Sequence, residues 1–316
     1  MMEQDEKTVE TVTDDYDSPW KEAVEHYFPE FMEFYFPEAY AQIDWSTEPV
    51  FLDQELRAIV HDAELGKRFV DKLVSVMLLN GDDKWIYIHV EVQGSRQVEF
   101  AKRMFVYYYR IFDRYDRPVA SMAVLADEHA NWKPTCYESE ALNCELTLKF
   151  PVAKLTDYHD QLDQLQASEN AFAYVTAAHI LTQRTRKNDH DRRDAKSQLV
   201  RLLYQRDWEK QRVIDLFLVI DSMMTLPSWL EKTIWQEITE IEESKKMQYV
   251  SSIERIGIAK GESKLLRKLL VRRFGELPVW VSDKLSSAGE QDLERWGEAV
   301  LSEPTLDAVF NADTKH

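Results

Sequence analysis

One ten-residue segment constrains the fold of this chain more than any other. In residues 84–93, KWIYIHVEVQ, polar and apolar side chains alternate, which is typical of a β-strand whose two faces meet different surroundings. The apolar run Leu73–Leu79 precedes it, and Asn80-Gly81-Asp82-Asp83 between the two is a strong turn signal. The two segments therefore predict an antiparallel hairpin.

The periodicity around this hairpin predicts the fold class. A helix is expected before it, over residues 53–65, and another after it, over 97–115. Val119–Ala126 reads as an apolar strand, and Glu145–Phe150 is a further strand candidate. This order predicts an α/β fold with a mixed sheet. From Ala167 onward only helical periodicity is visible, with helices expected over 167–185, 194–207, 210–225, 228–247 and within 262–311.

These patterns divide the chain into regions of different character. The expected regions are a flexible acidic tail over 1–18, an α/β core over 19–165, a helical region over 166–250 and a small helical domain over 251–316.

Composition limits the compartment and the partners. The formal net charge is −18, so nucleic acid could be held only by local basic patches on an acidic body. The N-terminus lacks the basic region of a signal peptide, and no apolar run is long enough for a membrane span. Cys136 and Cys144 show no metal-binding spacing, and so few thiols suit a reducing compartment. We therefore expect a cytoplasmic protein without a membrane partner.

The polar face of the 84–93 strand carries the candidate chemistry. His89, Glu91 and Gln93 share this face, although His89 is expected to be a half-buried strand residue rather than a ligand. Asp71 begins the preceding strand, and a hairpin can bring the start of one strand beside the end of the next. Two converging carboxylates would suit Mg²⁺, with Asp71 and Glu91 roughly 4–7 Å apart.

These residues carry a family resemblance. Asp71, the hairpin and Glu91-Val92-Gln93 resemble the D…(D/E)-x-K signature of the PD-(D/E)XK nucleases. FVDKLVSV, IHVEVQ and FAKRMFVYYYRIFDRYDRPVASMAVLAD are similar to the Rpn-like recombination-promoting nuclease and putative transposase branch of that superfamily. The later LLRKLLVRRFGELP is similar to a helical domain that often follows such cores. The resemblance implies a restriction-endonuclease-like mixed sheet flanked by helices, followed by an all-helical C-terminal region.

The resemblance also implies residue roles. Asp71 and Glu91 would bind Mg²⁺, and Gln93 stands where the class usually has Lys. Gln can orient a water but brings no charge and cannot act as a base near neutral pH. Family members often add a Glu from the preceding helix, for which Glu55 is the best match. Its rivals are Glu48 and Glu64.

Basic residues supply the candidate DNA contacts. Arg103 follows the site strand on a helix, where a phosphate contact and a salt bridge to a nearby acid are equally open. Lys264, Lys268 and Arg272 share one helical face, and Leu265, Leu266, Leu269 and Leu270 are expected to line another side. Residues 184–212 form a second basic segment. Either patch could instead be a solvated face or contact an acidic surface of the same protein.

The predicted function is a Mg²⁺-dependent DNA endonuclease that hydrolyses phosphodiester bonds in recombination or transposition. The alternative is a catalytically weak nuclease-fold protein that binds DNA or protein through its helical half. The intact Asp71 and Glu91 favour the enzyme, whereas Gln93 and the net charge favour the binding module. A DDE transposase is a third possibility, but this sequence shows no convincing third acid for such a triad. A homodimer is left open.

Overall fold

The computed structural model describes residues 17–60, 70–79, 85–247, 249–250, 265–275, 277–278, 280–281, 284–285, 290–303 and 305–310. The chain forms two compact units, residues 1–234 and residues 235–316.

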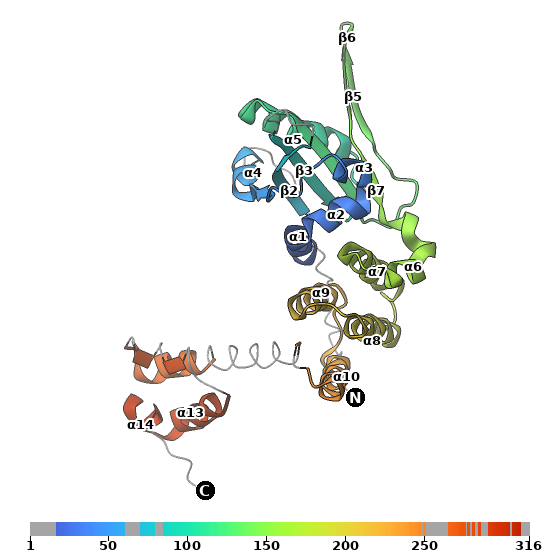
Figure 1. Cartoon of the computed structure of the whole chain (residues 1–316). Helices are drawn as coiled ribbons and strands as arrows, with labels where there is room; N and C mark the ends of the chain where they lie inside the picture. Colours follow the sequence, from blue (N-terminus) through green and yellow to red (C-terminus); the bar gives the residue numbers. More distant parts are fainter. Residues whose placement is uncertain are drawn as a thin grey trace, which may run out of the picture. The chain divides into compact units, whose positions relative to one another are not determined.

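A five-stranded mixed sheet lies at the heart of the first unit (Figure 1). Its order is β1-β2-β3-β4-β7. β1, β2 and β3 are antiparallel neighbours, and β4 and β7 run parallel to β3. The mixed sheet and the predicted hairpin are both confirmed. The strands are β1 (Val50–Phe51), β2 (Val70–Met77), β3 (Trp85–Gln93), β4 (Val119–Leu125) and β7 (Val152–Lys154).

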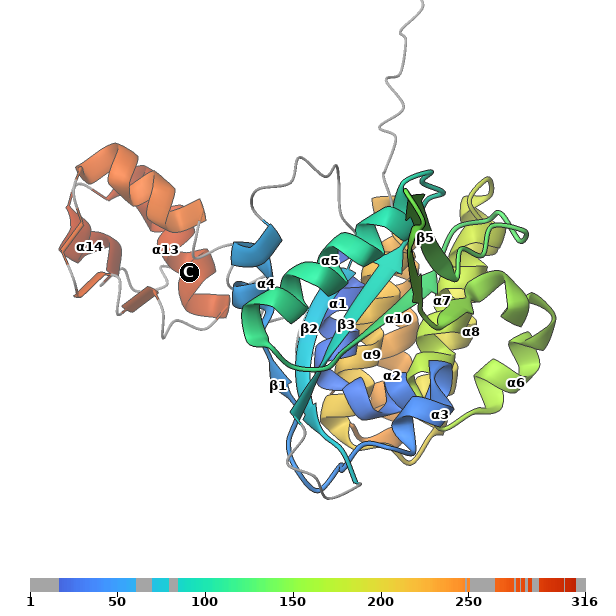
Figure 2. The same ribbon diagram turned by 90° about the horizontal axis from the view of Figure 1, so that it is seen from above.

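Helices α4 (Asp53–Val60) and α5 (Phe100–Tyr115) cover one face of this sheet (Figure 2). The parallel pairing of β3 with β4 requires a crossover, and α5 provides it. Its inward stripe buries Tyr107 and Ile111 against Leu73 of β2. Leu56 from α4 completes this cluster. The helix is thereby fixed directly above the polar side chains of β3.

The opposite face packs against helices from both ends of the first unit. They are α1 (Asp17–His26), α2 (Phe28–Tyr35) and α7 (Ala171–Arg184), with the short α3 (Pro37–Tyr40) after α2. Aromatic rings join them: the Phe31 and Phe172 centroids are 5.0 Å apart, and those of Trp20 and Phe172 are 5.9 Å apart. N-terminal helices are thus held by a helix that follows the sheet in sequence.

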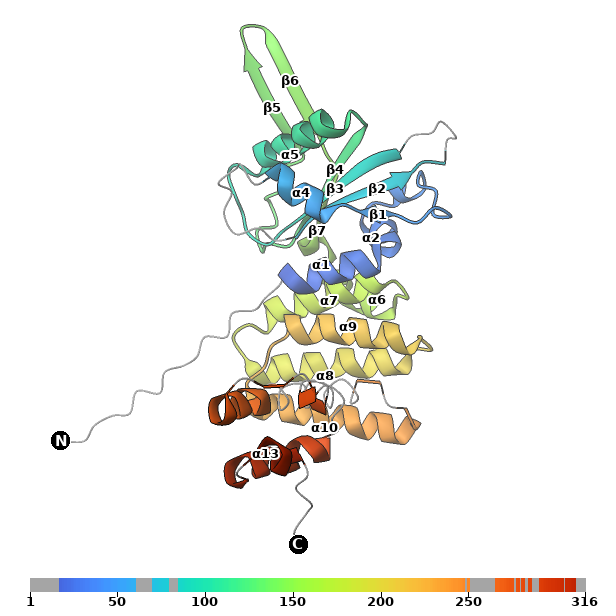
Figure 3. The same ribbon diagram turned by 90° about the vertical axis from the view of Figure 1, so that its left-hand side faces the viewer.

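The remaining helices of the first unit continue this packing away from the sheet (Figure 3). Every described element after β7 is a helix, so the helical part begins at Leu155, before the Ala167 that the sequence predicts. The compact unit nevertheless continues past residue 165 to Ile234, since α9 packs on both α1 and α7. The helices are η1 (Leu155–Gln161), α6 (Leu162–Ala167), α8 (Asp189–Gln205), α9 (Lys210–Met223) and the start of α10 (Ser228–Lys245).

A two-stranded ribbon projects from the first unit (Figures 1 and 3). It consists of β5 (Cys136–Ala141) and β6 (Cys144–Lys149) in antiparallel pairing. Leu142 and Asn143 form its turn with φ of 53° and 63°, the left-handed values of a tight hairpin. β6 overlaps the predicted strand Glu145–Phe150 but begins one residue earlier, whereas β5 was not predicted.

The second unit has a small helical core of its own. A helix over residues 265–274 buries Leu266 and Leu270 against α13 (Glu290–Ser302) and α14 (Leu306–Phe310). Trp296 and Phe310 stack edge-on at 4.7 Å between their ring centroids. In the described part of both units, no helix is long and apolar enough to cross a membrane.

Candidate functional site

Three polar side chains of β3 lie buried beneath α5. His89, Glu91 and Gln93 alternate along the strand on the same face, as the sequence pattern predicts, and all three are at most 1% exposed. The expectation that His89 is half-buried was wrong, because the Tyr107 ring of α5 lies across it with centroids 4.7 Å apart. Burying an ionised carboxylate is costly unless it is paired.

Arg103 of α5 provides that pairing. Its Nη2 donates to Glu91 Oε1 at 2.5 Å and also to Gln93 Oε1, while Nη1 donates to Gln97 Oε1. Gln93 is held further by its Nε2, which donates to the carbonyl oxygen of Ser95 at 2.7 Å. Of the two contacts considered for Arg103, the structure shows the ion pair, and a DNA contact stays a prediction.

His89 and Ser121 extend the polar layer toward the sheet interior. His89 Nε2 lies 3.8 Å from Glu91 Oε2, the carboxylate oxygen on the far side from Arg103. Ser121 of β4 is the register neighbour of His89, and its buried hydroxyl has no hydrogen-bond partner in the described part of the chain. The polar layer therefore crosses from β3 to β4.

Asp71 occupies the position that the hairpin prediction requires. It is the direct cross-strand partner of Glu91, and directly opposed residues of antiparallel strands belong to the same face of the sheet. The Asp71 side chain lies outside the described residues, so the predicted carboxylate separation stays a prediction. No described contact joins Glu55, which is exposed on α4, to Glu91. Glu48 is also exposed, and Glu64 lies outside the described residues.

The oxygen atoms available at this site are of the type that binds a divalent cation. The Glu91 carboxylate and the register position of Asp71 offer the oxygen ligands that Mg²⁺ prefers. A cation here would share Glu91 with Arg103, which already binds one of its two oxygens. Among the described side chains, no group of three or more His, Cys, Asp and Glu is arranged to hold a metal. Any metal site at Glu91 would therefore depend on Asp71.

A second buried cation lies one residue from Asp71, on the opposite face. Lys72 donates to Glu25 Oε2 of α1 at 2.9 Å and to Asp53 Oδ2 at the start of α4. This contact was not predicted, although a Lys within an apolar strand signals a need for nearby acids. It fastens both helices to β2.

A third polar cluster lies where the parallel strands end. Lys154 is the last residue of β7 and donates to the buried Asp127, which follows β4. Burial lowers the pKa of Lys154. A hollow of about 490 Å³ opens nearby, lined by Arg96, Glu128, His129, Ala130, Asn131 and Trp132. Ligands of open α/β sheets commonly bind beyond the carboxyl ends of the strands. One residue that lines the hollow, Arg96, comes three residues after Gln93 in the sequence.

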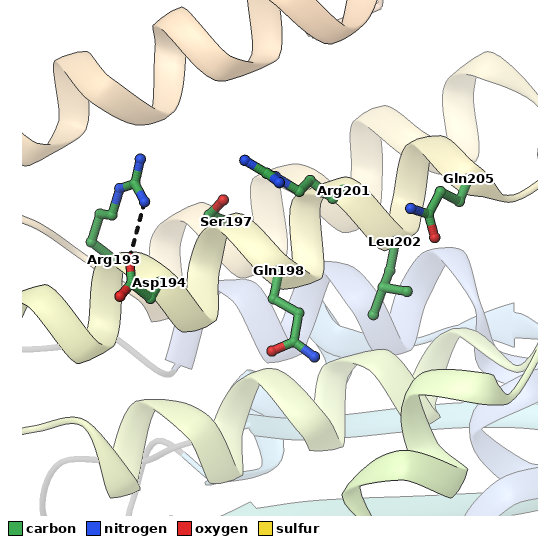
Figure 4. A pocket seen from close by; sticks show the side chains of 7 residues that line it. All are labelled: Arg193, Asp194, Ser197, Gln198, Arg201, Leu202 and Gln205. Carbon is green, nitrogen blue, oxygen red and sulfur yellow. Dashed lines mark hydrogen bonds and ion pairs between the residues drawn. The ribbon is translucent and has the colours of Figure 1, made fainter.

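The basic segment 184–212 is largely engaged within the protein. Arg212 forms a two-pronged ion pair with Glu30 of α2, Arg206 pairs with Glu169, and the buried Lys196 pairs with Asp221 and Glu231. These contacts match the alternative in which the basic residues meet an acidic surface of the same protein. A hollow of about 350 Å³ lies along α8. Figure 4 shows the side chains that line it: Arg193, Asp194, Ser197, Gln198, Arg201, Leu202 and Gln205.

The basic helix of the second unit keeps its charges outward. Lys268 and Arg272 are exposed, Leu266 and Leu270 are buried, and Lys264 lies outside the described residues. The expected apolar side is wrong at Leu265, which is 60% exposed. This helix, unlike the 184–212 segment, leaves cations in solvent.

Comparisons with known proteins add no assignment. A scan against protein-family models found no match, and searches of curated proteins and of solved structures found none.

Proposed function

We propose that this protein is a metal-dependent DNA endonuclease with a restriction-endonuclease-like core. The observation that carries the proposal is the register of β2 and β3, which sets Asp71 directly across from Glu91. A following helix and a parallel strand, α5 and β4, complete the order of elements that the PD-(D/E)XK resemblance implies. The same resemblance suggests recombination or transposition as the setting.

The proposed roles follow from the donor set. Asp71 and Glu91 would hold Mg²⁺, which when bound lowers the pKa of a coordinated water and neutralises phosphate charge. Gln93 would orient the attacking water through its amide, which the hydrogen bond to Ser95 holds in place. Glu55 remains a weaker candidate for a further acid, because no described contact brings it to Glu91.

Arg103 supports the proposal by supplying a positive charge beside Gln93. The class places a Lys at the Gln93 position, and Gln carries no charge. The Arg103 guanidinium contacts the side-chain oxygens of both Gln93 and Glu91. A cation delivered from α5 can therefore stabilise developing phosphate charge in place of that Lys.

Plasmid nicking by the purified protein, with and without Mg²⁺, tests the proposal. Asp71→Asn and Glu91→Gln should each reduce nicking by about 10²-fold or more, because both remove a proposed metal ligand. Asp113→Asn changes an exposed carboxylate of α5 and should nick like the unaltered protein. If the Asp71 and Glu91 variants nick as fast as the unaltered protein, the activity belongs to a contaminant.

A second function, a DNA- or protein-binding module, is favoured by a different observation. Glu91 is fully buried and already neutralised by Arg103, so the polar layer is stable as an internal ion pair. Gln93 and the net charge of −18 point the same way. Undetectable nicking, with Mg²⁺-independent DNA binding by the full chain, would favour this function over the enzyme.

A further inference from the structure

The projecting ribbon has two different faces. Because opposed residues of antiparallel strands share a face, Tyr137, Ser139, Leu146 and Leu148 lie on one side, and Glu138, Glu140, Glu145, Thr147 and Lys149 lie on the other. The Tyr137 ring stacks on Phe105 of α5, with centroids 4.9 Å apart, and so anchors the base of the ribbon through β5. Beyond this base the ribbon stands clear of the sheet (Figures 1 and 3).

Both outer edges of the ribbon lack a strand partner among the described residues. An isolated two-stranded hairpin is marginally stable in water, and an unpaired edge is a template for another strand. Leu146 is 38% exposed near the middle of β6, and Leu142 at the tip is fully exposed. The ribbon therefore has both the open backbone and the apolar surface of a docking element.

The sequence of β6 is complementary to itself. Residues 145–149 read Glu-Leu-Thr-Leu-Lys, which is symmetric about Thr147. If two copies of β6 pair in antiparallel register about Thr147, Glu145 faces Lys149 and Leu146 faces Leu148, with Thr147 opposite itself. Opposite charges, apolar pairs and Thr–Thr pairs are all favourable cross-strand neighbours. Neither Glu145 nor Lys149 has an ion pair among the described residues.

We propose that β6 pairs with β6 of a second copy of this chain, forming a symmetric dimer through a continuous four-stranded sheet. The contact is isologous, as a two-fold axis requires, because each residue meets its complement on the partner. The pairing places the Glu145 carboxylate of each copy beside Lys149 of the partner subunit, twice per dimer. The Leu146 and Leu148 side chains of the two copies meet on the other face.

The other edge and the other partner class fit less well. Antiparallel self-pairing of β5 about Ser139 would set Glu138 against Glu140 of the partner subunit, and opposed like charges destabilise a sheet. A nucleic acid would meet three glutamates and a single lysine on the polar face. The charges therefore select β6, and a second copy as its partner.

Sedimentation velocity of the full chain over a wide concentration range tests the proposal. The unaltered protein should be a dimer. Lys149→Glu and Glu145→Lys should each weaken the dimer about tenfold to a hundredfold, because each turns two attractive pairs into repulsive ones. The double variant E145K/K149E should restore it, because the charge pairs are only exchanged. A protein that is monomeric throughout would overturn the proposal.

Mixing the two single variants separates this partner from any other. In the mixed dimer every charged pair is attractive, so Lys149→Glu and Glu145→Lys chains should associate with each other far more tightly than with themselves. Glu138→Lys is the matched control: it reverses a charge on β5 whose cross-strand partner is the uncharged Thr147, and it should leave the dimer intact. Single variants as dimeric as the unaltered protein, or no gain on mixing, would exclude this interface.

Discussion

The two faces of the central sheet each hold a buried cation, but in different ways. Arg103 and Lys72 are 7% and 4% exposed, respectively. The Glu91 partner of Arg103 is 1% exposed, whereas the Glu25 and Asp53 partners of Lys72 are 54% and 25% exposed. Removal of Lys72 would leave its acids in contact with water, but removal of Arg103 would leave a charge inside the protein. Similar burial of two cations therefore does not imply a similar contribution to stability.

The largest effect on stability should come from Arg103→Met. Leaving Glu91 buried without its partner should lower the free energy of unfolding by about 3–5 kcal/mol, as measured by urea denaturation. Adding Glu91→Gln removes the stranded charge, so the double variant should recover much of the loss. If Arg103→Met is no less stable than Lys72→Met, the two buried cations contribute equally and the proposed difference between the two faces is wrong.

Lys72→Met should have a smaller effect, about 1–2 kcal/mol, because it removes charged hydrogen bonds but leaves acids that water can solvate. The same urea titration measures it. High salt should reduce the stability loss caused by Lys72→Met more than the loss caused by Arg103→Met, because screening acts most on exposed charges. A salt response equal to that of Arg103→Met would place both pairs in the same environment.

The helical side of the sheet should also respond to alkaline pH through Tyr35. Burial raises the pKa of this phenol well above its usual value of 10, so the stability it contributes is present below pH 10 and is lost as pH rises through the folded-state pKa. Tyr35→Phe removes the hydrogen bond to Thr176, so near neutral pH the variant should be less stable than the unaltered protein, a deficit of about 1 kcal/mol in the free energy of unfolding. Above about pH 10 this deficit should narrow by up to about 1.4 kcal/mol per pH unit.

Urea denaturation of both proteins near neutral pH and at about pH 11 measures this narrowing. Tyr109→Phe, which removes a hydroxyl from a side chain that is 51% exposed, is the control. A deficit for Tyr35→Phe that stays constant with pH would show that the Tyr35 phenol ionises as readily in the fold as outside it.

The smallest effect on stability should come from the basic helix of the second unit. Changing Lys264, Lys268 and Arg272 to Ala should alter unfolding by about 0.5 kcal/mol or less. If these cations contact DNA phosphates, the log–log salt slope of binding should fall by up to about 3. An unchanged slope would assign them to a solvated face, as the 184–212 segment is assigned to internal pairs.

Local patterns predicted the elements that position the candidate site. The alternation in residues 84–93 gave the buried polar face of β3, and the turn signal before it gave the pairing with β2. The missed strands β1 and β7 are two and three residues long, too short for periodicity to register. β5 carries Glu, Ser and Ala, which are weak strand formers, so its pairing with β6 was not visible in its own residues.

The ion pairs were harder to predict because their partners are distant in sequence. Arg212 meets Glu30 across 182 positions, and no local pattern marks either residue. Arg103 did carry a signal: it shares the inward stripe of α5 with Phe100, Tyr107 and Ile111. A guanidinium on an apolar stripe must find an acid inside the fold, and Glu91 on the facing strand was the available one.

The packing of α1 and α2 against α7 and α9 bears on how this chain is made on the ribosome. The aromatic face of α2, with Phe28 and Phe31, emerges early in synthesis, yet its Phe172 contact and the Arg212 pair of Glu30 are synthesised some 140–180 residues later. At roughly 5–20 residues per second, that interval lasts on the order of ten seconds or more. During this time Phe31 lacks its partner on α7, and exposed aromatic surface of this kind is what chaperones bind. Packing of α1 and α2 is therefore completed only after α7 and α9 have left the ribosome.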